Sequence, residues 1–472
     1  MIRNWSIVLL LAPWVWLPGC VLLDPTDPYA GAGSFATGES FRSSSQSAAT
    51  QSVQGPLTLE RAIEVALANN PDVAAIRHDL QAAGAQTDVA RGALLPSVHG
   101  LGGYNHYLDS QRLIPASENN QPGVFGPDIF SGDLVVTMPI YTGGRLSSEV
   151  NAAKLLQQSA SHQLARSREE LVFNVSSVFY GILAQRHVIE SLGFSQKALE
   201  EHLKRVNDLI DAQKAAKVDR LRTEVRLADL KQQIVRERNV LAIEERVLTN
   251  LLGVRGGSSP PTAAGELASP SETPAISVED ATSTAIKKRD DYLAARASLE
   301  AQAKRVDAAR AAQWPTVFLQ GSYGGRWAAD TTDHPSGTSS SDDVGRVGVY
   351  VDIPIFEGGR IEAGIREQKA KLAAAQERLR KLELQVRLDV ETAVLNIASA
   401  QERVVATEAA IDQAKESLRI EQEKYDLGKG SITDVLDAQS ALLNSQTNYY
   451  RALSDYSTAK AQLRLAIGAT TP

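Results

Sequence analysis

The chain has 472 residues, seven histidines, a single cysteine and a formal net charge of −7. Such a mild negative charge argues against a nucleic-acid partner, because proteins that bind nucleic acids carry a concentrated positive face. The histidines are scattered without the spacing of metal ligands, and no nucleophile elbow, phosphate loop or pair of catalytic acids stands out. We therefore predict that the protein is not an enzyme, and we expect no cofactor and no metal site.

The N-terminus reads as a secretory signal over residues 1–19, with an apolar core too short to span a membrane as a mature helix. The signal ends at Cys20 in a sequence that resembles a bacterial lipoprotein box, although Pro18 is not the usual small residue. We predict that Cys20 is lipidated and anchors the chain in membrane lipid; ordinary cleavage near Gly19 is the alternative. Residues 20–56 would form a flexible tether, because they are rich in Ser, Gly, Ala and Thr.

One long block of the sequence occurs twice. Residues 139–253 reappear as residues 354–468, always 215 positions later and without an insertion. A fixed register of this length indicates a duplicated structural unit. We predict repeats at 57–253 and 277–468, a linker at 254–276 and a C-terminal tail at 469–472. The turn that opens each block is marked by the same three residues, namely Gly143, Gly144 and Arg145 in the first and Gly358, Gly359 and Arg360 in the second.

Each block predicts a very long helix. Residues 366–427 contain neither Gly nor Pro and consist mainly of strong helix formers. Apolar residues recur there at a spacing of three to four, which places them on one helical stripe. A helix over residues 360–427 would be roughly 100 Å long, and its narrow apolar stripe indicates packing along a coiled-coil seam. We expect a reversal and then a second helix of about thirty-five residues.

Between the helices the apolar period changes from 3.6 to 2. Alternating segments predict one β-hairpin at about 95–141 and another at about 314–356, with about ten residues in each strand. This length and alternation are typical of a transmembrane barrel strand, although a half-buried soluble hairpin is the alternative. Four strands cannot close a barrel, so closure would need several chains.

These features together resemble the TolC family of bacterial outer-membrane efflux proteins. The resemblance runs from Leu57 to about Gly468 and depends on short motifs in a fixed order: residues 57–71, 90–96 and 425–438, and the two turns that contain Gly-Gly-Arg. It implies an α+β membrane protein in which a homotrimer completes one twelve-stranded transmembrane β-barrel. The long helices would continue as a coiled-coil α-barrel across the periplasm, with residues 254–276 in an equatorial belt.

The second helix reversal is the most informative candidate site. Gly428 and Gly430 would provide the freedom for the turn, and Asp434 and Asp437 lie three residues apart on one helical face. In a trimer these acids would form carboxylate rings that attract cations at a narrow mouth. The resemblance implies a gate role for Tyr425. The family often has an Arg at the position of Gly430, so a charge bridge that closes the mouth is missing here or supplied elsewhere.

The first reversal contains no glycine. We predict Asp219 as a further gate residue and Arg222 as a partner for Asp434 or Asp437. The alternative is that these acids merely favour a helix N-terminus. The resemblance also implies that an adaptor docks beside the tips, where Lys214, Lys217, Gly428 and Gly430 lie.

The predicted function is the exit duct of a tripartite efflux or type I secretion system in the bacterial outer membrane. The resemblance implies a periplasmic adaptor and an inner-membrane pump as its partners. A periplasmic adaptor and a structural trimeric coiled-coil lipoprotein are the alternatives. The sequence leaves the substrate open among drugs, metal ions, proteins and metabolites, and it leaves the class of pump open too.

Overall fold

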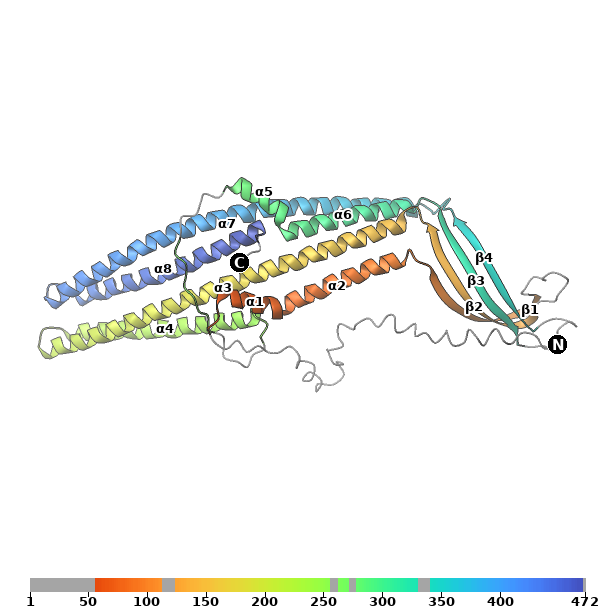
Figure 1. Cartoon of the computed structure of the whole chain (residues 1–472). Helices are drawn as coiled ribbons and strands as arrows, with labels where there is room; N and C mark the ends of the chain where they lie inside the picture. Colours follow the sequence, from red (N-terminus) through yellow and green to blue (C-terminus); the bar gives the residue numbers. More distant parts are fainter. Residues whose placement is uncertain (1–55, 113–123, 255–261, 271–276, 330–339, 470–472) are drawn as a thin grey trace. The chain divides into compact units, whose positions relative to one another are not determined.

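The computed structural model describes residues 56–112, 124–254, 262–270, 277–329 and 340–469, all within one structural unit (Figure 1). The predicted signal peptide and the lipidation at Cys20 lie outside the described residues, as does the predicted tether apart from Pro56.

The same order of six elements occurs twice, as the duplicated sequence predicts. The first copy consists of α1 (Leu59–Asn69), α2 (Pro71–Gly92), β1 (Ser97–Arg112), β2 (Phe125–Tyr141), α3 (Arg145–Asp211) and α4 (Lys217–Leu251). The second consists of α5 (Val278–Lys288), α6 (Asp290–Ala311), β3 (Thr316–Ala328), β4 (Ser341–Asp352), α7 (Arg360–Asp426) and α8 (Ile432–Ile467).

Local signals set where the short helices begin. The Thr58 hydroxyl caps α1 by accepting from the Arg61 amide at 3.4 Å. Asn70 caps α2 by accepting from the Asp72 amide at 2.9 Å, and Pro71, which has no amide hydrogen to lose, is the first residue of that helix. Ser277 caps α5, the duplicate of α1, in the same way.

The helices α3 and α7 each contain 67 residues, which corresponds to about 100 Å. Both begin after a pair of glycines with positive φ, a conformation that side chains with a Cβ atom disfavour. A Cβ atom at the first of these glycines in α3's turn would lie 2.8 Å from the Ala311 carbonyl oxygen. The φ values are 62° at Gly143, 87° at Gly144, 61° at Gly358 and 80° at Gly359.

The four strands form one antiparallel sheet in the order β1-β2-β3-β4. Its register aligns Tyr104 with Phe130 and Phe130 with Trp327, so the alternating apolar residues share one face. On the opposite face, Arg326 forms an ion pair with Asp133 at 2.9 Å. The large apolar side chains of the first face are 40–77 % exposed in the single chain: Val98, Tyr104, Phe130, Leu134, Val136, Met138, Tyr323, Trp327, Val347, Val349 and Val351.

The strands differ from the prediction in length. They contain 16, 17, 13 and 12 residues instead of about ten, because ladder pairing continues beyond the apolar segments. β4 ends at Asp352, although the alternating pattern continues to Ile355; Pro354 lacks the amide hydrogen needed to extend the ladder. None of the described helices is both long enough and apolar enough to span a bilayer.

Two apolar clusters hold the helical hairpins. One joins α3 and α4 to the first half of α8 and includes Leu199, Leu230, Ile432 and Leu436. The other joins α7 to the second half of α8 and to α5. It contains Val386, Val390 and Ile397, three members of the stripe predicted for α7, all less than 7 % exposed. Tyr450 packs against both clusters.

Part of the 254–276 linker runs along the start of α1. The Leu57 amide donates to the Thr262 carbonyl at 2.9 Å, and the Ala264 amide donates to the Leu57 carbonyl at 2.8 Å. Arg186 of α3 donates to the Ala263 carbonyl and pairs with Glu245 of α4 at 2.9 Å. This described stretch of the linker is therefore fixed to α3 and to the residue that precedes α1 by two positions.

Candidate functional site

The candidate site consists of the two turns that reverse the long helices. We call the turn between α3 and α4 tip 1 and the turn between α7 and α8 tip 2; both lie at the ends of the long helices away from the sheet (Figure 1). At tip 2, Gly428 has φ 71° and its amide donates to the Tyr425 carbonyl at 2.9 Å. The Lys429 amide donates back to the Lys424 carbonyl at 2.8 Å, which closes the end of α7.

Close packing, and not the backbone angle, favours glycine at position 430 of tip 2. A Cβ atom there would lie 2.9 Å from the Lys424 Cβ atom and 3.0 Å from the Tyr425 backbone nitrogen. The next residue, Ser431, begins α8 as its N-cap, and its hydroxyl accepts from the Thr433 amide at 3.2 Å. An arginine at the position of Gly430 would therefore need a displaced turn.

Tip 1 makes a similar turn without glycine. Gln213, at the position that corresponds to Gly428, has φ 58° and is the only described residue other than glycine with positive φ. The Lys214 amide donates to the Leu209 carbonyl at 2.7 Å. Its counterpart at tip 2, Lys429, makes the equivalent bond to the Lys424 carbonyl. Lys214 and Lys217 are exposed, as is Gly428 at tip 2, whereas Gly430 is half-buried.

Two of the predicted gate acids contact the start of their own helix. Asp219 accepts from the Ala216 amide at 3.4 Å, and Asp434 accepts from the Ser431 amide at 3.3 Å. Each contact satisfies the amide of the N-cap residue and so stabilises a helix N-terminus; at tip 1 the N-cap Ala216 has no side-chain acceptor with which to reciprocate. Asp437 lies one turn further along α8 and is exposed. Of these three acids, Asp437 alone has no capping contact in the described structure.

Arg222 connects the two hairpins at the tips. Its guanidinium donates to the Thr433 hydroxyl at 3.0 Å, so its contact is the residue beside Asp434 instead of the carboxylate of Asp434 or Asp437. The described residues contain no ion pair between Arg222 and either acid. The contact nevertheless joins α4 to the first turn of α8.

A second connection joins α3 to the end of α7. The rings of His202 and Tyr425 lie 5.4 Å apart, and Arg205 forms an ion pair with Asp426 at 3.1 Å. The His202 Nε2 atom and the Tyr425 hydroxyl are both buried without a hydrogen-bond partner. Burial lowers the pKa of His202. Burial, followed by the charges of Asp219 and Asp426, raises the pKa of Tyr425.

Sequence reasoning missed His202 and Arg205. A histidine among many polar residues of a long helix carries no spacing signal, and its partner lies more than two hundred positions away in α7. No group of three or more His, Cys, Asp or Glu residues in the described structure is arranged to hold a metal ion.

Comparison with known proteins gives a consistent result. The family model "Outer membrane efflux protein" matches residues 62–254 and 281–469, one segment in each repeat. The chain is 24% identical to outer membrane protein TolC of Vibrio cholerae serotype O1 over 401 residues, covering 85% of this chain and 88% of that protein. It is 22% identical to TolC of Escherichia coli over 409 residues, covering 85% and 80%.

Among solved structures, the CmeC outer membrane channel of Campylobacter jejuni superposes with a TM-score of 0.75 at 18% identity. The match covers 87% of this chain and 85% of that one. At this level of identity the superposition establishes a shared fold.

Proposed function

This chain belongs to the outer membrane efflux protein family, and from that membership we propose that three copies form one exit duct whose periplasmic mouth is built by tips 1 and 2. At the level of the family, the protein is an outer-membrane channel of a tripartite efflux system and is not an enzyme. TolC-like channels are trimers that work with a periplasmic adaptor and an inner-membrane pump.

The observation that supports the proposed duct is the four-stranded sheet. Its strands β1 and β4 each have one neighbour, and one face exposes large apolar side chains along all four strands. Unpaired strand edges are not tolerated in a hydrocarbon layer, because backbone groups there find no water to bind. Joining β1 of one copy to β4 of the next closes the sheet, and three copies give an even number of strands within the range of outer-membrane barrels. The apolar face then meets lipid.

The carboxylates of tip 2 support a cation-attracting mouth. Asp434 and Asp437 share one face of the first turns of α8, and both are exposed in the single chain. Three copies of each around an axis would place six carboxylates at the mouth, and such rings favour cations over anions. Asp219 of tip 1 adds a third acid of the same kind, and Arg222 and Tyr425 hold the hairpins together beside it.

The exposed tips also suit a docking partner. We propose that a periplasmic adaptor contacts the tips around Lys214, Lys217, Gly428 and Gly430, where the turn backbone and two lysines are accessible apart from the half-buried Gly430. An inner-membrane pump would supply the substrate and the energy, and the lipid anchor at Cys20 would add a second attachment to the outer membrane.

Single-channel recording in a planar bilayer tests the duct and its mouth. Wild type is compared with Asp434→Asn/Asp437→Asn and with Asp79→Asn/Asp412→Asn, a control that removes two exposed charges from α2 and α7. We expect a small cation-selective conductance that multivalent cations block, and we expect the block to be relieved only in the tip variant. Conductance unchanged in the tip variant would place the constriction elsewhere. No conductance from a verified folded trimer would refute the duct.

A further inference from the structure

A cavity of about 660 Å³ lies between α1, α3 and α8, away from both tips, and we call it the α1–α3–α8 cavity. This volume falls in the range of sites that hold small organic molecules. Its wall is largely apolar and aromatic, with Ile63 and Leu67 from α1, Phe173 and Tyr180 from α3, and Tyr456 from α8. Such a wall suits the hydrophobic body of a ligand.

Glu169 of α3 is the polar group in this wall with a carboxylate oxygen that lacks a hydrogen-bond donor. Its side chain is 5 % exposed and lines the cavity. One carboxylate oxygen, Oε2, lies 3.4 Å from Arg166 Nη1, whereas the other, Oε1, is buried without a hydrogen-bond partner. A buried carboxylate oxygen without a donor is costly, because burial removes the water that would otherwise solvate it.

Glu169 is not the only group whose charge Arg166 offsets. The guanidinium also forms an ion pair with Glu170 at 2.8 Å and donates to the Leu465 carbonyl at 3.2 Å. Glu170 is half exposed and is absent from the cavity wall. The positive charge of Arg166 is therefore divided among three acceptors, and Glu169 receives the longest of the three contacts.

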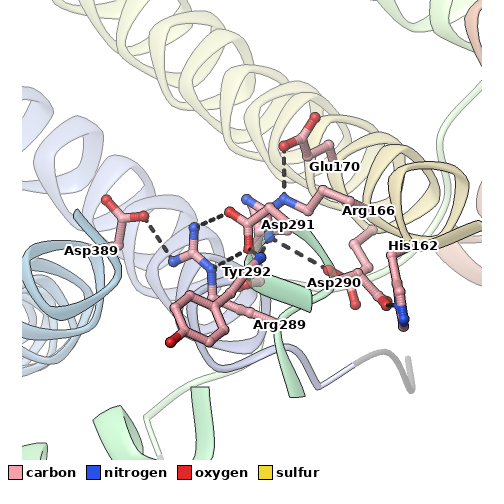
Figure 2. A network of polar contacts seen from close by, with 10 residues as sticks. His162, Arg166, Glu170, Arg289, Asp290, Asp291, Tyr292 and Asp389 are labelled. Atoms are coloured by element: carbon pink, nitrogen blue, oxygen red, sulfur yellow. Dashed lines mark hydrogen bonds and ion pairs between the residues drawn. The ribbon is translucent and has the colours of Figure 1, made fainter. Parts of the chain in front are cut away.

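A second acid increases the negative potential at the same point. Asp290, the first residue of α6, lines the cavity and lies 2.6 Å from His162 Nδ1 (Figure 2). Its position is fixed because Arg289, beside it, is buried and paired with Asp291 at 2.6 Å and with Asp389 of α7 at 2.8 Å (Figure 2). Burial, followed by the charge of Asp290, raises the pKa of Glu169 to about 7.

Basic side chains also face the cavity, but none of them satisfies Glu169. Arg168 on α3 and Lys460 and Arg464 on α8 line the wall, as do the acids Glu60 on α1 and Glu266 in the linker. Within the described structure no ion pair joins any of these three cations to Glu169. Lys460 lies instead over the Tyr456 ring, 5.6 Å from its centroid. The unmet requirement in the cavity is thus a donor at Glu169 Oε1.

We propose that the α1–α3–α8 cavity binds an amphipathic organic cation whose ammonium group donates to Glu169 Oε1, while its apolar body packs against Phe173 and Tyr180. The site is formed by residues of one chain. It therefore does not depend on the number of copies in the duct or on where the pore is narrowest. The cation therefore binds at a place distinct from the carboxylates of tip 2.

Fluorescence titration of the purified full-length protein with dansylcadaverine tests this site, since the probe is a primary ammonium with an apolar fluorophore. Empty detergent micelles measure the background, and dansylglycine provides the same fluorophore on an anion. We expect saturable binding of dansylcadaverine and at least about tenfold weaker binding to Glu169→Gln, because a hydrogen bond to a charged group is lost. Glu170→Gln is the matched control: it removes a neighbouring carboxylate that shares Arg166 but does not line the cavity.

A measurement on the unaltered protein covers the case in which Glu169→Gln fails to fold. Since an ammonium binds the ionised carboxylate, affinity of the wild type should rise as the pH increases from 6 to 8 through the raised pKa of Glu169. The amine of the probe stays charged over this range. Tighter binding of dansylglycine, no saturable binding above the micelle background, or a Glu170→Gln variant weakened as much as Glu169→Gln would overturn the proposal.

Discussion

The two tips share two backbone hydrogen bonds across the turn, and tip 1 adds a third from the Ala215 amide to the Leu209 carbonyl at 3.3 Å, but they have different residues at the position with positive φ. Tip 2 has Gly428 there at φ 71°, whereas tip 1 has Gln213 at φ 58°. A residue with a Cβ atom in this conformation is disfavoured by about 1–2 kcal/mol. Tip 2 also begins its descending helix with a serine cap, and tip 1 begins with Ala216, which has no side-chain acceptor. The duplicated backbone is therefore held by local sequence at tip 2 and by surrounding contacts at tip 1.

The largest expected effect is that of Gly430→Ala at tip 2. The added Cβ atom would lie within 3.0 Å of the Lys424 side chain and the Tyr425 backbone, so the turn has to move at a cost of about 1–3 kcal/mol. Hydrogen exchange at the Gly428 and Lys429 amides measures the loss as reduced protection. Ala215→Gly at the corresponding position of tip 1 is the control, and a similar loss there would contradict the comparison.

A smaller pair of opposite effects should follow from exchanging residues at the left-handed position. Gly428→Ala should destabilise tip 2 by about 1 kcal/mol, and Gln213→Gly should stabilise tip 1 by up to the same amount, because glycine relieves the strain. The amides of Lys429 and Lys214 report the two turns separately by hydrogen exchange. If both substitutions destabilised their tips, the positive φ of Gln213 would not be a source of strain.

Exchanging the caps should give effects of similar or smaller size. Ser431→Ala removes the hydroxyl that accepts from the Thr433 amide and should cost about 1 kcal/mol, whereas Ala216→Ser should stabilise the start of α4 by a similar or smaller amount. Amide protection in the first turn of α8 or α4 measures each change. If both substitutions changed amide protection in the same direction, the cap would not distinguish the two tips.

The smallest effect concerns pH and should appear where α3 contacts the end of α7 beside tip 2. Because burial lowers the pKa of His202 below its ordinary value of 6.5, the folded tip binds a proton less readily than the opened tip does. Its stability is therefore retained above that value and falls as the pH drops below it. Between pH 7.5 and 5.5 we expect lower protection around Tyr425, whose counterpart at tip 1 is the non-titrating Ile210.

The variant His202→Gln should abolish this dependence on pH. His187→Gln is the control, since His187 lies on the same helix but stacks on Tyr450 with its ring centroid 4.6 Å away. A fall in protection that persists in His202→Gln would assign the effect to another group.

Periodicity and helix-breaking residues were sufficient to predict most of the fold. The absence of Gly and Pro from residues 366–427 predicted a helix to residue 427, and α7 ends at Asp426. Alternation located the strands but underestimated their length, because strand pairing needs only a partner backbone and not an apolar side chain. The partner of Arg222 could not be predicted, since it depends on how α4 packs beside α8. The contact is the hydroxyl of Thr433, one residue away from the expected Asp434.

The division of α8 between two clusters has a mechanical consequence. Its first turns, with Ile432 and Leu436, pack on α3 and α4, whereas its later turns, with Leu453 and Tyr456, pack on α7. An outward swing of tip 2 must peel the first part of α8 from the neighbouring hairpin while the second part stays attached. Tyr450, which packs against both clusters, marks the point where α8 passes from one cluster to the other. Movement of tip 2 is therefore coupled to the first hairpin, because the start of α8 packs on α3 and α4.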